Sequence, residues 1–250
     1  MKTIYTIFKK ELKSYFASPI AYIVLFVFLL LSGIFFFLYV ENFAQSQLDP
    51  RFQFIGEALN LNQYIIEPYF GTISVIMLLI IPIITMRLIA EERKSFTAEL
   101  LFTSPIRVSY ILIGKYIASL FLFFIMLVLS VVFVLVTVLY GNPDIGPLLS
   151  GYLGLFLLGA SSIAVGIFAS SLTENQIVAA IVSFGILLVF WIVGATSDAE
   201  NSILGYLSII NHYEDFTKGI IDIKDVVYYL SFTFFGLFLS YIMLDSERWR

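Results

Sequence analysis

The stretch Arg87–Ile106, RLIAEERKSFTAELLFTSPI, is a charge-dense segment between two long apolar runs, and the rest of the chain is arranged around it. On a helical wheel Ile89, Phe96 and Leu100 fall on one narrow stripe, and Lys94, Glu91 and Ser95 are turned away from it. This pattern predicts a short amphipathic helix over about residues 89–102, lying at a membrane surface.

The composition is that of an integral membrane protein. Hydrophobic residues make up 60% of the 250 residues and charged residues only 13%, whereas a soluble domain carries roughly 25% charged residues. The chain has no Cys, which excludes disulfides, thiolate metal sites and cysteine nucleophiles, and its single His leaves no histidine metal cluster. The composition therefore predicts membrane-spanning segments joined by loops.

Six apolar runs are long enough to cross a membrane, because about 20 helical residues span about 30 Å of hydrocarbon. They are expected over about residues 20–40, 69–86, 116–139, 148–172, 177–195 and 226–244. Pro82 should kink the second span near its far end. The sequence thus predicts an all-α polytopic membrane protein whose residues 1–250 form a single transmembrane domain.

Several helix starts have local signals. Ser18-Pro19 precedes the first span, and Ser104 followed by Pro105 is typical of an N-cap with proline at the first helical position. This second pair should end the amphipathic helix and start the next helix. Residues 173–176 have the spacing of a capping box, Thr to Gln, before the fifth span.

Residues 1–18 predict an interfacial helix that lies along the lipid headgroups. One side of its helical projection is apolar, and Glu11 is the exception on that side. The other side carries the lysines Lys2, Lys9, Lys10 and Lys13. A secretory signal peptide is the competing interpretation, but the apolar run over 20–40 is too long for one and no small-x-small cleavage site follows.

Two long polar regions lie between spans. Residues 41–68 read as a polar loop with four acids and one base, Arg51. In the second region, residues 203–221 alternate apolar and polar residues as a short helix or a helical hairpin would, and we expect this segment to pack on the outer membrane face.

The bases fall mainly on one side of the membrane when alternate loops are placed on alternate sides. The minority side receives Arg51, Lys218 and Lys224, and the other side receives the remaining eleven of the fourteen. By the positive-inside rule both termini and the amphipathic helix are cytoplasmic.

The predicted spans contain no Asp, Glu, Lys, Arg or His, which argues against an ion-coupled carrier, since such carriers usually keep an ionisable group near the midplane. The chain also lacks the G-x-x-x-x-G-K-[ST] phosphate loop, so any nucleotide chemistry belongs to a partner. We therefore expect no enzyme activity and no bound cofactor. A plain alternative for the amphipathic helix is a solvated loop whose charges only fix topology.

Residues 1–250 resemble the ABC-2 type permeases, the membrane subunits of ATP-binding-cassette transporters with a separate ATPase. Within that family the chain looks closest to the gliding-motility-associated and nitrous-oxide-reductase-maturation permeases. The stretches that carry the resemblance are KKELKSYFASPIAYI at 9–23, MRLIAEERKSFTAELLFTSPI at 86–106, SSLTENQIVAA at 170–180 and NHYEDFTKGIIDIKDVVYYL at 211–230.

The resemblance implies that the amphipathic helix is a coupling helix that docks on the ATPase. The implied docking residues are Glu91, Glu92, Arg93, Lys94, Thr97 and Glu99, with Phe96 and Leu100 packing back on the bundle. The turn formed by Thr173, Glu174, Asn175 and Gln176 would be a second, smaller contact.

The resemblance also implies an assembly in the bacterial cytoplasmic (inner) membrane. It would hold two ATPases, which bind ATP and Mg, and two permease chains, identical or homologous, surrounded by lipid and without nucleic acid. Closure of the ATPases on ATP would rock the two bundles and open a path between them. An alternative is an ATPase-coupled transducer or scaffold that acts on an extracytoplasmic partner protein.

A membrane serine protease is a third class, because Ser161 could pair with His212. Ser161 lies about thirteen residues into its span, about 20 Å below the outer surface, whereas His212 lies in the outer segment. This depth argues against the pair and leaves His212 as a structural hydrogen-bonding residue. The same segment contains four acids that could bind a divalent cation. Helix capping by Asp222 and a solvated acidic face explain these acids equally well. They are Glu214, Asp215, Asp222 and Asp225.

A row of small residues marks the fourth span. Ser162, Gly166 and Ser170 repeat at intervals of four residues. Such rows occur at helix–helix contacts, and more often serve close packing within one bundle than contact with a second chain.

Overall fold

A computed structural model describes residues 2–48, 60–95, 106–195 and 203–247. These residues form helices and connecting turns without a strand, and six helices are long and apolar enough to cross a membrane. The elements are α1 (Lys2–Ala17), α2 (Pro19–Leu48), the π-helical turn η1 (Asn62–Ile66), α4 (Glu67–Thr85), α5 (Arg87–Lys94), α7 (Val108–Gly141), α8 (Ile145–Ser171), α9 (Gln176–Ala195), α10 (Ile203–Leu207), α11 (Asn211–Thr217) and α12 (Ile223–Glu247). The predicted all-α, six-span class is confirmed.

Some helices extend beyond the predicted spans. α2 continues to Leu48, so the first part of the predicted polar loop 41–68 is helical. α7 begins at Val108, before the predicted span 116–139, and its N-cap is Arg107 in an extended conformation. The predicted Ser104–Pro105 cap lies outside the described residues. The length of an apolar run shows only how much of a helix is needed to cross the membrane. Polar residues can continue the same helix into water at little cost in free energy. Ser18 does precede α2, and its Oγ accepts the Ile20 N–H at 3.3 Å.

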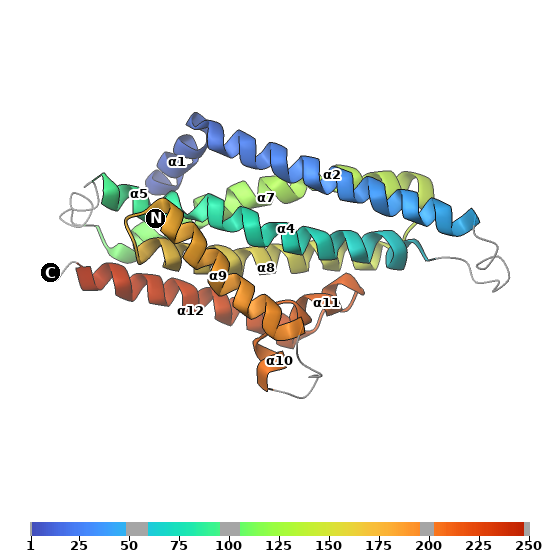
Figure 1. Ribbon diagram of the computed structural model, residues 1–250. Helices are drawn as coiled ribbons and strands as arrows, with labels where there is room; N and C mark the ends of the chain where they lie inside the picture. Colours follow the sequence, from blue (N-terminus) through green and yellow to red (C-terminus); the bar gives the residue numbers. More distant parts are fainter. Residues whose placement is uncertain (1, 49–59, 96–105, 196–202, 248–250) are drawn as a thin grey trace.

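α4 and α8 are the buried centre of the bundle, and the other spanning helices surround them (Figure 1). Small residues on α8 allow this close approach. A methyl group added at Gly159 would overlap the Phe123 ring, and one at Gly166 would overlap the Thr85 side chain. The row of Ser162, Gly166 and Ser170 is buried and therefore serves packing within this chain, as the sequence favoured.

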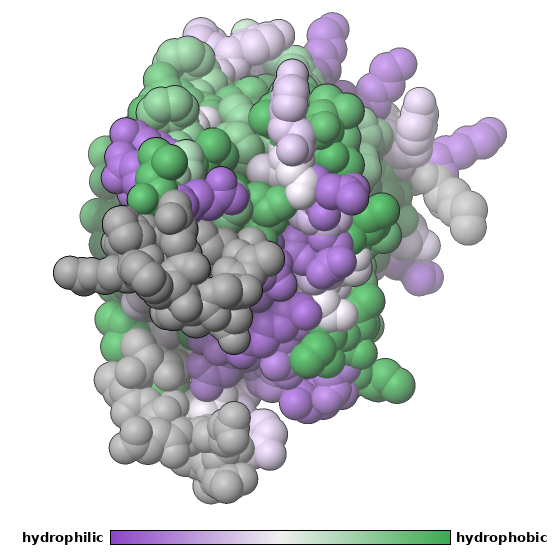
Figure 2. Space-filling view, turned by 90° about the vertical axis from the view of Figure 1, so that its right-hand side faces the viewer, coloured by the Kyte–Doolittle hydropathy of each residue, from purple (hydrophilic) through white to green (hydrophobic). Residues whose placement is uncertain are grey.

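The two ends of the bundle differ. α1, α5, the start of α9 and the end of α12 lie at one end, and the α7–α8 turn lies at the other (Figure 1). Figure 2 looks onto the α7–α8 end, where hydrophilic side chains gather between hydrophobic flanks. The bundle therefore has a polar end cap there and apolar sides.

The outer segment forms two short helices, α10 and α11, which confirms the helical prediction for residues 203–221. α11 packs against α4, α8 and α12. Ser150 Oγ of α8 donates to the Phe216 carbonyl at 2.7 Å, so the segment is held against the bundle.

Candidate functional site

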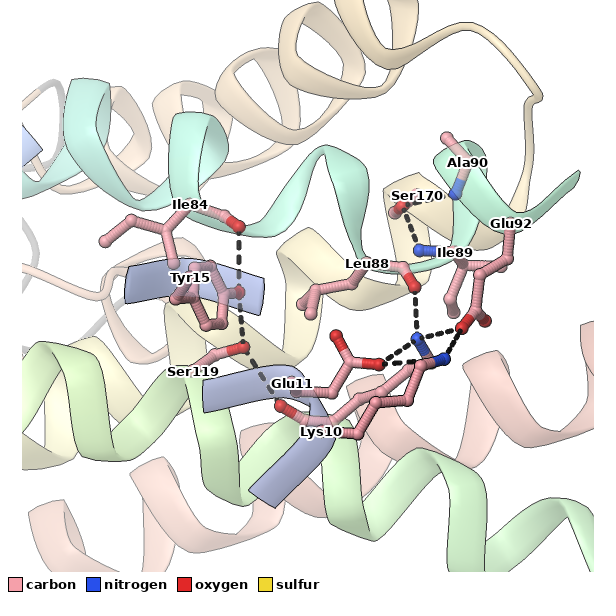
Figure 3. Close-up of polar contacts among 11 residues, drawn as sticks. Lys10, Glu11, Tyr15, Ile84, Leu88, Ile89, Ala90, Glu92, Ser119 and Ser170 are labelled. Carbon is pink, nitrogen blue, oxygen red and sulfur yellow. Dashed lines mark hydrogen bonds and ion pairs between the residues drawn. The ribbon is translucent and has the colours of Figure 1, made fainter. Parts of the chain in front are cut away.

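The amphipathic helix is joined to the centre of the bundle at its first turn. α5 follows α4 after the single residue Met86. Ser170 Oγ of α8 donates to the Met86 carbonyl at 2.9 Å and accepts the N–H groups of Ile89 and Ala90, both at 3.1 Å (Figure 3). First-turn N–H groups lack partners within their own helix. The Ser170 hydroxyl is the acceptor for two of these N–H groups and thereby fixes the start of α5 on α8.

A buried lysine joins three further elements at the same end. Lys115 of α7 is only 2% exposed, and its Nζ lies 2.9 Å from Glu11 Oε1 of α1 and 2.9 Å from Glu92 Oε1 of α5. It also donates to the Leu88 carbonyl at 2.7 Å. An ammonium group has three N–H donors, and each has an acceptor here. Figure 3 shows the Glu11 and Glu92 carboxylates and the Leu88 carbonyl converging on the same place between α1 and α5, where the ammonium group lies.

This arrangement adds two charged residues to the buried structure. Lys115 lies inside α7, directly before the predicted span 116–139. Glu11, the apparent exception in the amphipathic pattern of α1, is a buried ion-pair partner rather than an imperfection. Lys10 stands at the rim of the cluster, where its Nζ lies 3.1 Å from Glu92 Oε1. Burial lowers the pKa of Lys10 and the Glu92 carboxylate raises it, and the net shift is upward.

Tyr15 links α1 to α4 and α7. Its hydroxyl donates to the Ile84 carbonyl at 3.1 Å and lies 3.1 Å from Ser119 Oγ. Burial raises the pKa of Tyr15 above its usual value, so the hydroxyl stays neutral. The Arg87 guanidinium lies over the Tyr15 ring, 4.4 Å from its centroid, in the geometry of a cation–π contact.

The predicted docking residues take different positions. Glu91 and Lys94 are exposed, and Arg93 is half-buried. Glu92 is turned inward to Lys10 and Lys115. The remaining predicted residues, Phe96, Thr97, Glu99 and Leu100, lie outside the described residues, as does most of the second half of the predicted helix 89–102. Its described part begins two residues earlier than predicted, at Arg87.

The second predicted contact lies beside the first, because α5 packs against both α8 and α9. Glu174 and Asn175 are exposed, and Thr173 and Gln176 are half-buried. The predicted capping box is wrong in its cap. Asn175 Oδ1 accepts the Ile177 N–H at 2.9 Å, and Thr173 Oγ1 accepts the Asn175 N–H at 3.1 Å. Asn175, which directly precedes α9, is better placed than Thr173 to satisfy its first turn.

Three residues of this site were not predicted from the sequence: Lys115, Ser170 and Tyr15. Glu11 was the one available signal, because a charge on the apolar side of an amphipathic helix needs a buried partner. The partner itself lies 104 residues away in the chain. No local pattern could identify it.

A second polar cluster holds the outer segment to α12. His212 Nδ1 of α11 lies 2.6 Å from Asp225 Oδ1, and His212 Nε2 lies 3.1 Å from the Tyr206 carbonyl oxygen of α10. The His212 ring stacks on Tyr228, with centroids 4.0 Å apart. Asp225 is fully buried, so the interpretation of it as part of a solvated acidic face is wrong. This position makes His212 a structural hydrogen-bonding residue.

The other outer acids and Ser161 have ordinary structural partners. Asp222 Oδ1 accepts the Lys224 N–H at 3.0 Å, which confirms it as the cap of α12. Lys224 Nζ lies 3.6 Å from Asp215 Oδ2. Within the described ranges, no three His, Cys, Asp or Glu side chains are grouped as metal ligands. Ser161 Oγ donates to the Leu158 carbonyl of its own helix at 2.8 Å, and His212 is bonded elsewhere.

Comparison with known proteins gives one family. The family model described as "ABC-2 family transporter protein" matches residues 5–244, which include α1, the whole bundle and the outer segment. A search of curated proteins gives no match.

Proposed function

The chain belongs to the ABC-2 family of transporter proteins, and on this premise we propose that it couples ATP hydrolysis by a separate ATPase subunit to substrate movement across the cytoplasmic membrane. Family membership makes it a multi-pass membrane permease component of an ABC transporter, a system that includes an ATPase. What we propose is the coupling role, in which ATP hydrolysis by the ATPase drives the movement of substrate.

The attachment of α5 carries this proposal. α5 continues α4 through Met86, is held to α8 by Ser170, and is held to α1 and α7 by Lys115. A helix on a flexible loop would absorb a push from outside. A helix joined to α1, α4, α7 and α8 by buried bonds would transmit that push to the core of the bundle, because packed cores shift between discrete arrangements rather than deform continuously.

The proposed docking surface consists of the exposed residues at this end of the bundle. Glu91 and Lys94 of α5 lie near Glu174 and Asn175 of the α8–α9 turn, since α5 packs on α8 and α9. We include Arg93 and Gln176 at its edge, and Phe96, Thr97, Glu99 and Leu100 by family resemblance. Glu92 and Thr173 are better assigned to holding the surface in place.

The same proposal covers the assembly. Two copies of the ATPase, with ATP and Mg bound there, would act on two permease chains, identical or homologous. The bases concentrated at the α5 end support a cytoplasmic position for that end and for both termini in a bacterial inner membrane. The four quoted stretches support the gliding-motility and nitrous-oxide-reductase-maturation subgroup within the family.

A transducer that acts on an extracytoplasmic protein is the second candidate function. It is favoured by the attachment of the outer segment, where α11 is held to α8 by Ser150 and to α12 by the pair of His212 and Asp225. A segment fixed in this way could pass movement of the bundle to a protein outside. Such a protein should co-purify with the intact chain and be lost when residues 203–221 are replaced by a Gly/Ser linker.

Purification of the tagged chain from its native membrane in mild detergent tests the coupling proposal. Mass spectrometry should find a P-loop ATPase in the purified sample, and ATP turnover should depend on the permease. A chain that comes alone in several detergents, and that leaves ATP turnover of the candidate ATPases unchanged, would contradict the proposal.

A further inference from the structure

A polar cleft of about 190 Å³ lies between α1 and α5, beside the cluster around Lys115. Lys10, Ser14, Arg87 and Glu91 are among the residues that line it. The cleft is several times the roughly 30 Å³ that one water occupies in the liquid. We propose that it binds the phosphate group of a membrane phospholipid, with the Arg87 guanidinium as the main contact.

The charges around the cleft leave one buried cation without a carboxylate. Glu11 and Glu92 are both matched by Lys115, and Glu92 also by Lys10. Arg87 is 9% exposed, and none of the carboxylates that the structure describes lies within ion-pair distance of it. Glu91 also lines the cleft, but its side chain is exposed to water. Three cations and three carboxylates line the cleft, so its lining is neutral as a whole: Lys10, Arg87 and Lys115, and Glu11, Glu91 and Glu92. Arg87 is the buried cation that no described carboxylate meets within ion-pair distance.

The Arg87 guanidinium lies over the Tyr15 ring, 4.4 Å from its centroid, and Arg87 lines the cleft. A planar guanidinium presents paired N–H donors that match the oxygens of a phosphate. A buried cation without a nearby anion is unfavourable, and a bound phosphate would supply that anion to Arg87.

The position of the cleft favours a lipid as the source of the phosphate. One wall is α1, whose apolar residues Phe8, Leu12 and Phe16 pack on the bundle while Lys9 and Lys13 stay exposed. A helix with this pattern lies at the level of the headgroups, and its lysines attract anionic lipids. Ser14, which is exposed and lines the cleft, can donate a further hydrogen bond to the phosphate.

Native mass spectrometry of the delipidated chain tests this proposal with dioleoyl phosphatidylglycerol as the probe. The wild-type chain should bind one molecule, and Arg87→Gln should weaken binding at least tenfold. Arg107→Gln is the matched control, because Arg107 is an exposed cation at the same end that does not line the cleft. Dioleoylglycerol, which lacks the phosphate, should not bind, and millimolar inorganic phosphate should not displace the lipid.

A second variant guards against misfolding of Arg87→Gln, because Arg87 also contacts Tyr15. Ser14→Phe should fill the cleft, leave Arg87 in place and weaken lipid binding to a similar degree. Equal lipid binding in wild type, Arg87→Gln and Ser14→Phe would overturn the proposal. If inorganic phosphate displaces the lipid, the cleft binds a soluble anion instead. If Arg87→Gln binds lipid normally but loses a co-purifying ATPase, the cleft belongs to the contact with the ATPase. Neither measurement of lipid requires the ATPase, so this test is independent of the coupling proposal.

Discussion

Lys115 Nζ lies 2.9 Å from Glu11 Oε1, although 104 residues separate the two in the chain. This ion pair joins α1 to α7, and the contact of Lys115 with Glu92 extends it to α5. The amphipathic helix at the end of the bundle is thus part of the buried structure. This relationship leads to the predictions that follow.

Lys115→Met should destabilise the protein by about 3–5 kcal/mol, because the largely buried Glu11 and Glu92 carboxylates lose the buried cation that they share. Thermal unfolding in detergent measures the effect. Lys13→Met, which removes an exposed lysine of α1, should leave the melting temperature nearly unchanged. Adding Glu11→Gln and Glu92→Gln to Lys115→Met should recover part of the loss. Equal melting temperatures for Lys115→Met and wild type would contradict the assigned role.

Ser170→Ala should loosen the first turn of α5, because the N–H groups of Ile89 and Ala90 lose their acceptor. Loss of a hydrogen bond worth about 1.4 kcal/mol corresponds to about tenfold faster amide exchange. Hydrogen–deuterium exchange of residues 87–94 measures the change. Ser171→Ala is the control, since Ser171 Oγ bonds only to the Phe168 carbonyl of its own helix. The same exchange rate in both variants would show that Ser170 does not hold α5.

Gly166→Ala should destabilise the bundle by about 1–3 kcal/mol through overpacking. The added methyl group would overlap Thr85 Oγ1 and lie 2.7 Å from Thr85 Cβ. Gly185→Ala in α9 meets nothing within 4 Å and should be neutral or stabilising by up to about 1 kcal/mol. Chemical or thermal unfolding compares the two. Thr85→Gly should rescue Gly166→Ala, and a Gly166→Ala chain as stable as wild type would argue against this contact.

Exchanging the charges of Glu91 and Lys94 should weaken association with the ATPase and leave stability within about 0.5 kcal/mol of wild type, because both side chains are exposed. Glu91→Lys with Lys94→Glu keeps the net charge constant. The matched control is Glu214→Lys with Lys218→Glu, an exposed pair on α11 in the outer segment. Co-purification and ATP turnover provide the readout. If the α5 exchange and the α11 exchange retain equal amounts of ATPase, the docking surface lies elsewhere.

His212→Leu should release the outer segment, because it leaves the buried Asp225 carboxylate without the imidazole that lies 2.6 Å from it. Removing one partner of a buried pair costs about 3–5 kcal/mol. Limited proteolysis should cut faster between α10 and α12, while ATPase co-purification stays the same. Asp215→Asn, which affects a pair near the surface, should change little. Unchanged proteolysis of the His212→Leu chain would show that the pair does not hold the segment.

Local patterns predicted the helices better than the contacts between them. The Ser18-Pro19 start, the Asp222 cap and the helical outer segment depend on neighbouring residues, and the structure confirms all three. The predicted cap of α9 was wrong, because Asn175 and Thr173 lie close together in the chain and Asn175 is the one that bonds to the first turn. Glu92 shows the same limit at the site, since the family resemblance implied that it faces the ATPase, whereas its partner Lys115 lies inside the bundle.

The sequence by itself determined that the chain spans a membrane with six helices and that its base-rich segments share one end. Hydrophobic length and charge distribution are properties of continuous segments, so they can be read without the fold. Only the tertiary structure decided that Lys115 is buried between Glu11 and Glu92 and that Ser170 holds the start of α5. These contacts depend on the rotation and depth of each helix in the bundle, which packing between segments far apart in the sequence sets.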